Sequence, residues 1–453
     1  MRHMRKGDNL NQSKRILLEC SNTWESDENT GIQRVVRNII KEAPGVEKDF
    51  AVESVPAIVK FDHFRRSGKK SLMSIIKAKC LYFLKKIYHK IMPFFKRFSL
   101  PEKVEYFLVS NVRRFMLVVF SILFFPLTIR LFFQPKIIPR RGDVLLLLDS
   151  SWMYPIWPVV EKAKYDGAVV GLVVHDIIPL THPYFFPSAI TERFNDWFGQ
   201  AVGHVDFFIG VSETVQKEVQ AYLEQNYPYC QAHGRVGFFH LGCTLDSISK
   251  NKSVGNGPKE LFKRNNVFIA VGTIEPRKNH KYLLDAFDLV WQECPGASLC
   301  IIGKIGWLSD HIVNRIKKHP LFKKNLFMFN DASDTELNYC YRHSRALIFS
   351  SFAEGFGLPI VEALGYGLPV FASDIPIHRE VGKDFCTYFD INDPACLAKM
   401  IIDIEKTGKM PQARSNNEYK LLTWKDSCRE LFTQVHILSR SQTGWMAGGS
   451  YKC

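Results

Sequence analysis

Residues 345–365 read RALIFSSFAEGFGLPIVEALG, and this stretch decides the fold. Four apolar residues after Arg345 predict a short buried strand, and the Ser, Ala, Glu and Gly residues that follow predict a loop. Pro359 suits the first turn of a helix, where its missing N–H is no loss. The helix start offers unpaired N–H groups and a positive dipole end to a phosphate. Two carboxylates, Glu354 and Glu362, flank it as hydroxyl acceptors, so the stretch suits a sugar nucleotide.

The length and the charge of the chain bound its organisation. With 453 residues, two domains of about 150–200 residues are expected rather than one core. The formal net charge of +15 is unevenly spread, because residues 61–140 hold 17 Lys and Arg against 3 Asp and Glu. This one segment therefore decides which partners the charge attracts.

The basic segment 61–140 predicts a membrane contact. Residues 69–98 interleave cations with apolar side chains, and residues 115–129 form an apolar run with arginines on both sides. A spanning helix needs about 20 apolar residues, so basic amphipathic helices lying in the interface fit better. The alternatives are a helical insertion packed on the first domain with solvated cations, and a re-entrant or spanning helix. The segment is too apolar for a nucleic-acid surface, so no nucleic-acid partner is expected.

The cysteines indicate the compartment. Eleven cysteines are scattered without a C-x-x-C pair, and the N-terminus lacks the apolar core and cleavage site of a signal peptide. Free thiols in a reducing cytoplasm are the expected state, and no metal-ligand spacing is present. With the basic segment, this predicts a cytoplasmic protein attached peripherally to the membrane.

The first half of the chain has an α/β rhythm. Residues 15–20 predict a strand, and residues 30–40 predict a helix capped by Thr30, with apolar residues at helical spacing. Residues 168–174 predict a buried strand that runs directly into His175 and Asp176. Ligands bind at the carboxyl ends of strands in open α/β sheets. His175 is therefore either a structural hydrogen-bonding residue or a group that faces the substrate.

The second half repeats this rhythm after a linker rich in Ser, Asn, Gly and Lys at residues 247–259. The strand 266–272 leads into a loop that carries Arg277 and Lys278, which are either surface cations or ligands of a diphosphate. A final helix is expected from Trp424 onward.

Several motifs together resemble the retaining glycosyltransferases of family 4. E-G-F-G-L-P-x-x-E-A at 354–363 is similar to their donor-site motif, and similar strings are H-D-x-I-P at 175–179, G-T-x-E-x-R-K-N at 272–279 and G-x-x-G-W at 303–307. The resemblance runs from about residue 30 to 424 and leaves out the basic segment. It implies the GT-B fold, in which two Rossmann-like doubly wound α/β domains face each other across a cleft. The expected parts are an acceptor-side domain (1–250, with the insertion 61–140), a donor domain (251–425) and a crossover helix with tail (426–453).

The resemblance also implies an activity. It is transfer of a hexose from a GDP- or UDP-linked donor to a hydroxyl of a glycan or lipid-linked acceptor, with retention and without a metal or other cofactor. Similar proteins suggest mannose and bacterial surface-polysaccharide assembly. The residues expected in catalysis are His175, Arg277, Lys278 and Glu354. Those expected at the donor are Gly31, Gly272, Gly303, Phe356, Gly357, Leu358 and Glu362.

Two alternative functions stay open on the sequence. A GT-B epimerase or phosphorylase would need a different acid/base set, for which no motif is present. A catalytically inactive membrane adaptor would tolerate loss of the two cations and two glutamates, all of which are present.

Overall fold

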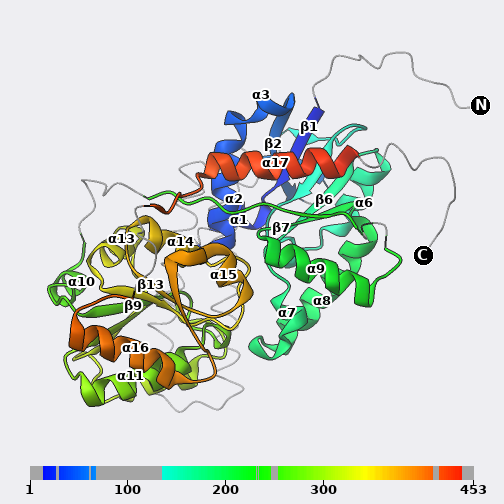
Figure 1. The fold of residues 1–453 in the computed structure, drawn as a ribbon. Helices are drawn as coiled ribbons and strands as arrows, with labels where there is room; N and C mark the ends of the chain where they lie inside the picture. Colours follow the sequence, from blue (N-terminus) through cyan, green and yellow to red (C-terminus); the bar gives the residue numbers. More distant parts are fainter. Residues whose placement is uncertain are drawn as a thin grey trace, which may run out of the picture.

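The computed structural model describes residues 14–26, 30–60, 63–67, 135–230, 232, 234–245, 254–411 and 418–440. Within them the chain forms two α/β domains, each built on one sheet that is wholly or mostly parallel (Figure 1). This confirms the predicted α/β class with two doubly wound domains.

The first domain contains eight strands among the described residues, in the order β4-β3-β2-β1-β5-β6-β7-β8. Its parallel strands are β1 (Lys14–Glu19), β2 (Val52–Lys60), β5 (Val144–Leu147), β6 (Val169–Val174), β7 (Phe207–Gly210) and β8 (Val236–Phe238). Every residue of β5 and of β7 is buried. Unbroken apolar runs of this kind are typical of parallel strands covered on both faces.

The ends of the basic segment differ from the predicted helical insertion. β3 (His63–Arg66) pairs antiparallel with β2, and β4 (Lys136–Ile137) pairs antiparallel with β3, so both extend the sheet of the first domain. Phe64 and Ile137 are neighbours in this ladder and are buried. Both therefore belong to the core of the first domain and not to a basic surface. Residues 68–134, which carry most of the predicted membrane contact, lie outside the described residues.

The helices of the first domain include α2, whose start was predicted from its cap. Thr30 and Gln33 form a reciprocal capping box at its N-terminus, and Val35, Val36 and Ile39 face the core. The helices are α1 (Ser21–Glu25), α2 (Gly31–Glu42), α3 (Glu47–Phe50), α6 (Trp157–Tyr165), α7 (Ile178–Thr181), α8 (Ser188–His204) and α9 (Glu213–Asn226).

The second domain has six parallel strands in the described part of the chain, in the order β11-β10-β9-β12-β13-β14. They are β9 (Val267–Val271), β10 (Ser298–Ile302), β11 (Leu326–Phe329), β12 (Ala346–Phe349), β13 (Val370–Ser373) and β14 (Cys386–Phe389). The helices are α10 (Asn256–Leu261), α11 (His280–Glu293), α12 (Asp310–Lys318), α13 (Asp334–His343), α14 (Leu358–Gly365), α15 (Pro376–Gly382) and α16 (Pro394–Thr407). α10 begins inside the predicted linker, which is therefore shorter than expected.

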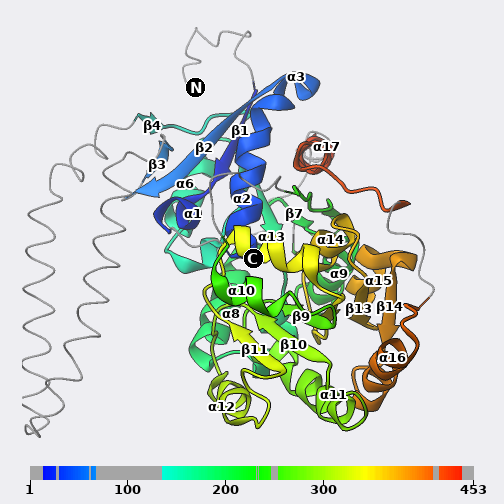
Figure 2. The ribbon, with the colours of Figure 1, turned by 90° about the vertical axis from the view of Figure 1, so that its left-hand side faces the viewer.

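Side chains of the second sheet alternate between two cores. Phe268 and Ile348 join the core under α11 and α16, whereas Ile269 and Leu347 join a core shared with α13, α14 and the first domain. The two-residue period of a strand produces this division. Figure 2 shows the two helix layers on opposite sides of the sheet. The face that carries α14 is thus the one packed toward the first domain.

The last helix, α17 (Trp424–Arg440), returns to the first domain and packs against α2 (Figures 1 and 2). The Ser427 hydroxyl donates to the carbonyl oxygen of His240 at 2.6 Å. The rings of Phe432 and Phe50 meet edge to face at 5.8 Å. The chain therefore crosses between the domains twice, which limits how far they can separate.

Candidate active site

Two loops of the second domain bring a pair of cations onto one carboxylate. The loop after β9 carries Arg277 and Lys278, and the loop after β12 carries Glu354. Arg277 Nη1 lies 2.7 Å from Glu354 Oε2, and Arg277 Nε lies 2.7 Å from Glu275 Oε1. Lys278 forms an ion pair with the other oxygen of Glu354. These groups form a charge-paired centre at the carboxyl ends of adjacent strands.

Burial sets the charge balance of this centre. Burial opposes the ionised form of Glu354, but Arg277 and Lys278 outweigh it and hold its pKa well below the usual range. Burial also lowers the pKa of Lys278, although Glu354 counteracts it. The pKa of Arg277 is raised, because Glu354 and Glu275 outweigh its loss of hydration. Glu354 and Lys278 therefore depend on this pairing for their charged forms, whereas Arg277 is charged in any case.

Backbone contacts fix the two loops relative to each other. The Phe352 amide donates to the Arg277 carbonyl at 2.8 Å, and Arg277 Nη1 donates to the Ala353 carbonyl at 3.1 Å. The Ser350 hydroxyl donates to the Lys278 carbonyl at 3.0 Å. The position of the cations is thus set by hydrogen bonds rather than by side-chain packing alone.

The glycines predicted at the donor site pack the loops together. A Cβ atom on Gly303 would lie 1.9 Å from the carbonyl oxygen of Gly272, so only glycine allows this approach. Gly357 is the N-cap of α14, and Leu358 and Pro359 form its first turn, as predicted for the proline. Gly272 and Gly303 are therefore explained by loop packing in this structure.

The first domain reaches this centre through His175 and Asp176, at the end of β6. A Cβ atom on Gly355 would lie 1.8 Å from the carbonyl oxygen of His175, so the two domains meet here backbone to backbone. His175 Nε2 donates to the Leu148 carbonyl at 2.9 Å, and burial lowers its pKa, which favours the neutral ring. Burial raises the pKa of Asp176, although Arg277 counteracts it. His175 thus has a structural contact and also borders the candidate site.

Glu362 lies in a second centre with different partners. The Tyr341 hydroxyl donates to Glu362 Oε2 at 2.8 Å, and Arg34 of α2 forms an ion pair with the other oxygen. Glu362 is buried, with 6% of its surface exposed. The predicted helix at residues 30–40 corresponds to α2, but Arg34 was not among the predicted site residues, although it is a cation one turn beyond Gly31. No local sequence pattern pointed to Tyr341 as a site residue, because its partner Glu362 is 21 residues away in the sequence.

Gly31 and Phe356 complete the predicted set. Gly31 is the first residue of α2, three residues before Arg34, and the space beside it is open. Phe356 is buried at the domain boundary, with its ring centroid 6.2 Å from that of His240. The structure therefore groups the predicted residues into the charge-paired centre, the Glu362 centre and the α14 start.

A third contact joins the domains at Glu380 of α15. Its carboxylate accepts hydrogen bonds from the Glu213 amide at 2.7 Å, the Thr214 amide at 2.8 Å and His240 Nε2 at 2.8 Å. Burial opposes the ionised form, but these donors, together with the Thr214 hydroxyl, lower the pKa of Glu380 to about 2. Glu380 thus caps the N-terminus of α9 from the other domain, a role that sequence analysis missed.

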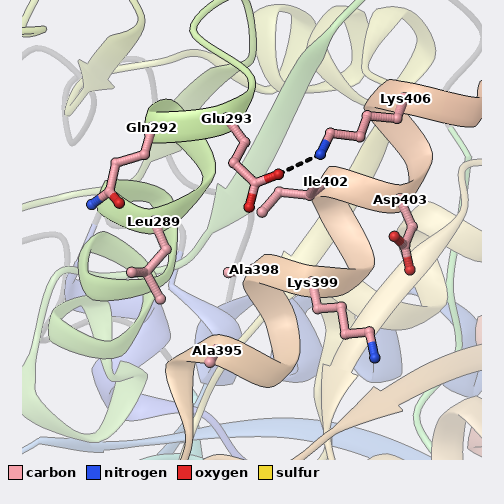
Figure 3. Close-up of a pocket in the computed structure, with 9 residues that line it drawn as sticks. All are labelled: Leu289, Gln292, Glu293, Ala395, Ala398, Lys399, Ile402, Asp403 and Lys406. Carbon is pink, nitrogen blue, oxygen red and sulfur yellow. Dashed lines mark hydrogen bonds and ion pairs between the residues drawn. The ribbon is translucent and has the colours of Figure 1, made fainter.

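The pocket drawn in Figure 3 lies away from these groups. It is a groove of about 360 Å³ between α11 and α16, crossed by an ion pair between Lys406 and Glu293. Its lining residues come only from these two helices, so it forms no part of the candidate site.

The fold and the position of these groups define a two-domain α/β protein of the GT-B architecture. Residues 256–421 match the family described as glycosyl transferases group 1. The second domain is therefore a glycosyl transferases group 1 domain, and the charge-paired centre, Glu362 and the start of α14 all lie within it.

Curated relatives cover more of the chain. The chain is 33% identical over 309 residues to the serotype-specific mannosyltransferase WbdA of Escherichia coli, an alignment that covers 66% of this chain and 38% of WbdA. The chain thus spans well under half the length of that relative. It is 26% identical over 300 residues to the O-antigen chain mannosyltransferase RfbU of Salmonella typhimurium, with 62% of this chain and 78% of RfbU covered.

Solved structures share the fold over nearly the whole chain. Sucrose-phosphate synthase from Thermosynechococcus elongatus has a TM-score of 0.53 at 14% identity, with 95% of this chain and 98% of that chain covered. Anabaena HepE, in complex with UDP and glucose, has a TM-score of 0.51 at 12% identity and the same coverage. These similarities confirm the predicted GT-B fold.

The described residues also bear on membrane insertion. Among them, no helix combines the length and the apolar character needed to cross a bilayer. The apolar run 115–129 lies outside the described residues.

Proposed function

We propose that this chain is a glycosyltransferase that moves a hexose from a nucleoside-diphosphate sugar to a hydroxyl of a glycan or lipid-linked acceptor. The observation that carries the proposal is the charge-paired centre, in which Arg277 and Lys278 converge on Glu354 at the carboxyl ends of β9 and β12. The group 1 domain contains all three residues, which supports their assignment to the donor.

The main chemical task is to stabilise negative charge on the departing diphosphate. Arg277 and Lys278 supply two cations held by backbone contacts, and the first amides of α14 add a dipole end. Burial lowers the pKa of Lys278, so an arriving diphosphate would strengthen its charged form. In this proposal the two cations replace a divalent metal, and reaction proceeds without a cofactor.

The remaining residues hold the sugar nucleotide. Glu354 would bind hydroxyls of the transferred sugar and Glu362 those of the ribose, with Arg34 sharing Glu362. The ion pairs on Glu354 leave it poorly suited as a nucleophile. We therefore propose retention of configuration without a covalent intermediate on Glu354. His175 borders the sugar site as a neutral hydrogen-bonding group.

The identity of the sugar is proposed from the relatives. Those reported above are named mannosyltransferases, one of them for the O-antigen chain. We propose mannose as the sugar and GDP as its carrier, with the acceptor in surface-polysaccharide assembly. A membrane-bound acceptor would suit peripheral attachment through the basic segment 61–140.

A panel of nucleotide sugars tests the donor site. The melting temperature of wild type is measured with GDP-mannose, UDP-glucose and UDP-N-acetylglucosamine, beside Lys278→Met and Lys281→Met. Lys281 follows three residues later and is exposed, so it is the matched control. A ligand at a hundred times its dissociation constant adds about 2.7 kcal/mol to the folded state. We expect GDP-mannose to stabilise wild type and Lys281→Met but not Lys278→Met.

Other results would contradict the proposal. Stabilisation by no nucleotide sugar, with or without vesicles of anionic lipid, would favour an inactive adaptor. Consumption of a donor with release of an epimer or a sugar phosphate would favour the epimerase or phosphorylase. Sedimentation with anionic vesicles that is lost at high salt would support peripheral attachment.

A further inference from the structure

Exposed aromatic side chains gather where the two domains meet. Tyr184 of the first domain is 69% exposed, and Trp307 and Phe352 of the second domain are 36% and 37% exposed. Ile305 and Leu308, on either side of Trp307, are exposed as well. Five of the eleven large apolar side chains that are exposed in the described part of the chain thus lie in three short connections, one of which contains the 3-10 helix Pro183–Phe185. Such a concentration of apolar side chains on a solvent-exposed surface marks an interaction site.

These loops touch across the domain boundary. Trp307 Nε1 donates to the Phe185 carbonyl at 3.0 Å, and the Phe186 and Trp307 ring centroids are 5.5 Å apart. The Phe185 and Phe352 rings stack at 5.6 Å with an interplanar angle of 20°. Phe185 is buried beneath the exposed rings, and its ring centroid lies 4.5 Å from that of Tyr184. We call Tyr184, Trp307 and Phe352 the aromatic patch.

The aromatic patch adjoins the charge-paired centre. Phe352 stands two residues before Glu354, and its amide donates to the Arg277 carbonyl. Tyr184 follows the segment that begins with His175 and Asp176, which borders the same centre. A molecule bound on the patch would therefore extend from the place where the sugar is transferred.

We propose that the aromatic patch binds the acceptor glycan at sugar units beyond the one that is glycosylated. The C–H faces of pyranose rings are apolar and weakly positive, and they pack on the negative faces of aromatic rings. The Trp307 N–H is already used by the Phe185 carbonyl, so the ring face is the part left for a ligand. This inference rests on the proposed function, because it assigns a subsite to that reaction.

Two other roles compete with a glycan subsite. Contact between the domains explains Phe185, which is buried, but it leaves the exposure of Tyr184 and Trp307 unexplained. Insertion into lipid would use the same apolar atoms. The patch, however, is made of rings that lie beside the reaction centre, and in the proposed function the acceptor has to reach that centre.

The test compares acceptor lengths. Binding of mannose and of an α-linked mannotetraose is measured calorimetrically on the full chain, for wild type, Tyr184→Ala, Trp307→Phe and Tyr165→Ala. Tyr165 is 90% exposed at the end of α6 and is the matched control. Transfer to both acceptors and hydrolysis of the donor are measured on the same proteins.

We expect Tyr184→Ala to weaken tetrasaccharide binding and its kcat/KM about tenfold, the effect of one well-placed aromatic contact. Its effects on mannose and on donor hydrolysis should stay within about twofold, as should all effects of Tyr165→Ala. Trp307→Phe keeps a ring face and should retain most of the binding.

Three results would overturn the inference. Equal losses of binding for both acceptor lengths would mean that Tyr184 only supports the fold. Unchanged tetrasaccharide binding would mean that the patch does not bind the glycan. Reduced sedimentation of Tyr184→Ala with vesicles of neutral lipid, at unchanged tetrasaccharide binding, would identify a membrane contact. Failure of the proposed function is distinct, because then no protein transfers mannose to either acceptor or hydrolyses the donor, while the binding comparison still decides the role of the patch.

Discussion

The two glutamates of the donor motif stand eight residues apart and are held in different ways. Glu354 is paired with Arg277 and Lys278, which belong to the same domain. Glu362 is paired with Tyr341 of its own domain and with Arg34 of the other. The first centre is therefore complete within the second domain, whereas the second centre is complete only when the domains meet. If Glu354 takes part in transfer and Glu362 binds the nucleotide, as proposed, the reacting centre is built within one domain and the nucleotide site includes a residue of the other.

The largest effect is expected at the intradomain centre. Arg277→Met removes the cation that contacts two buried carboxylates, Glu354 and Glu275. Breaking a buried ion pair costs about 3 kcal/mol of folding stability, and losing one charge-stabilising donor slows catalysis by about 10²–10³-fold. Urea unfolding and transfer rates measure both. Arg315→Met is the control, because Arg315 also contacts two carboxylates, Asp285 and Asp288, but all three side chains are partly exposed and lie on α11 and α12, outside the two loops of the centre. It should change the stability and the rate by less than Arg277→Met. A rate loss below about threefold would remove Arg277 from the chemistry.

The interdomain contact at Glu380 should give the next largest effect, with a pH dependence. Its folded pKa is about 2, below the usual 4.5. A depressed pKa contributes stability that is present above the usual pKa and is lost as pH falls toward 2. We expect Glu380→Gln to cost about 2 kcal/mol at pH 7 after allowance for its partial exposure. The difference from wild type should shrink between about pH 5 and 2.

Urea midpoints measured across this pH range test the prediction. A difference that stays constant with pH would mean that the loss comes from packing rather than from the carboxylate charge.

Arg34→Met tests the interdomain half of the comparison. The Arg34 side chain is 33% exposed, and Glu362 keeps its bond to Tyr341, so the expected loss is only about 1–2 kcal/mol. Transfer should slow less than in Arg277→Met, mainly through weaker donor binding. Lys41→Met, on the same helix and 74% exposed, is the control. If Arg34→Met slows transfer as much as Arg277→Met does, both centres take part in the chemical step. The proposed difference between the intradomain and the interdomain centre would then be wrong.

These contacts show what the sequence could predict. Arg277, Lys278 and Glu354 were predicted at the site because their loops resemble motifs of a known family. The structure brings the three residues together, since β9 and β12 are parallel neighbours whose following loops lie at one edge of the sheet. Arg34 and Glu380 were missed because their partners are set by how the two domains pack, and Tyr341 was missed because its partner lies on another helix of the same domain. No local pattern encodes either kind of contact. The capped start of α2 was predicted, since its signal is local.

The ends of the basic segment were missed for a related reason. β3 and β4 are 4 and 2 residues long and become strands only by pairing with β2 and with each other. Such short runs carry too little periodicity to stand out from a neighbouring cationic stretch. Composition described the segment as a whole and could not locate its ends.

The smallest effect is expected at Gly31, and it decides whether the open side of α2 belongs to the donor site. Gly31→Ala adds a methyl group into open space at a helix start, so the free protein should gain about 0.5 kcal/mol. If the donor lies over this helix start, the same methyl should weaken its binding severalfold. Gly203→Ala, also in a helix and facing open space, should give the stability gain without the binding loss. Equal donor affinity in both variants would place Gly31 outside the donor site. Arg34, which pairs with Glu362, would then be the residue of α2 expected to lie beside the donor.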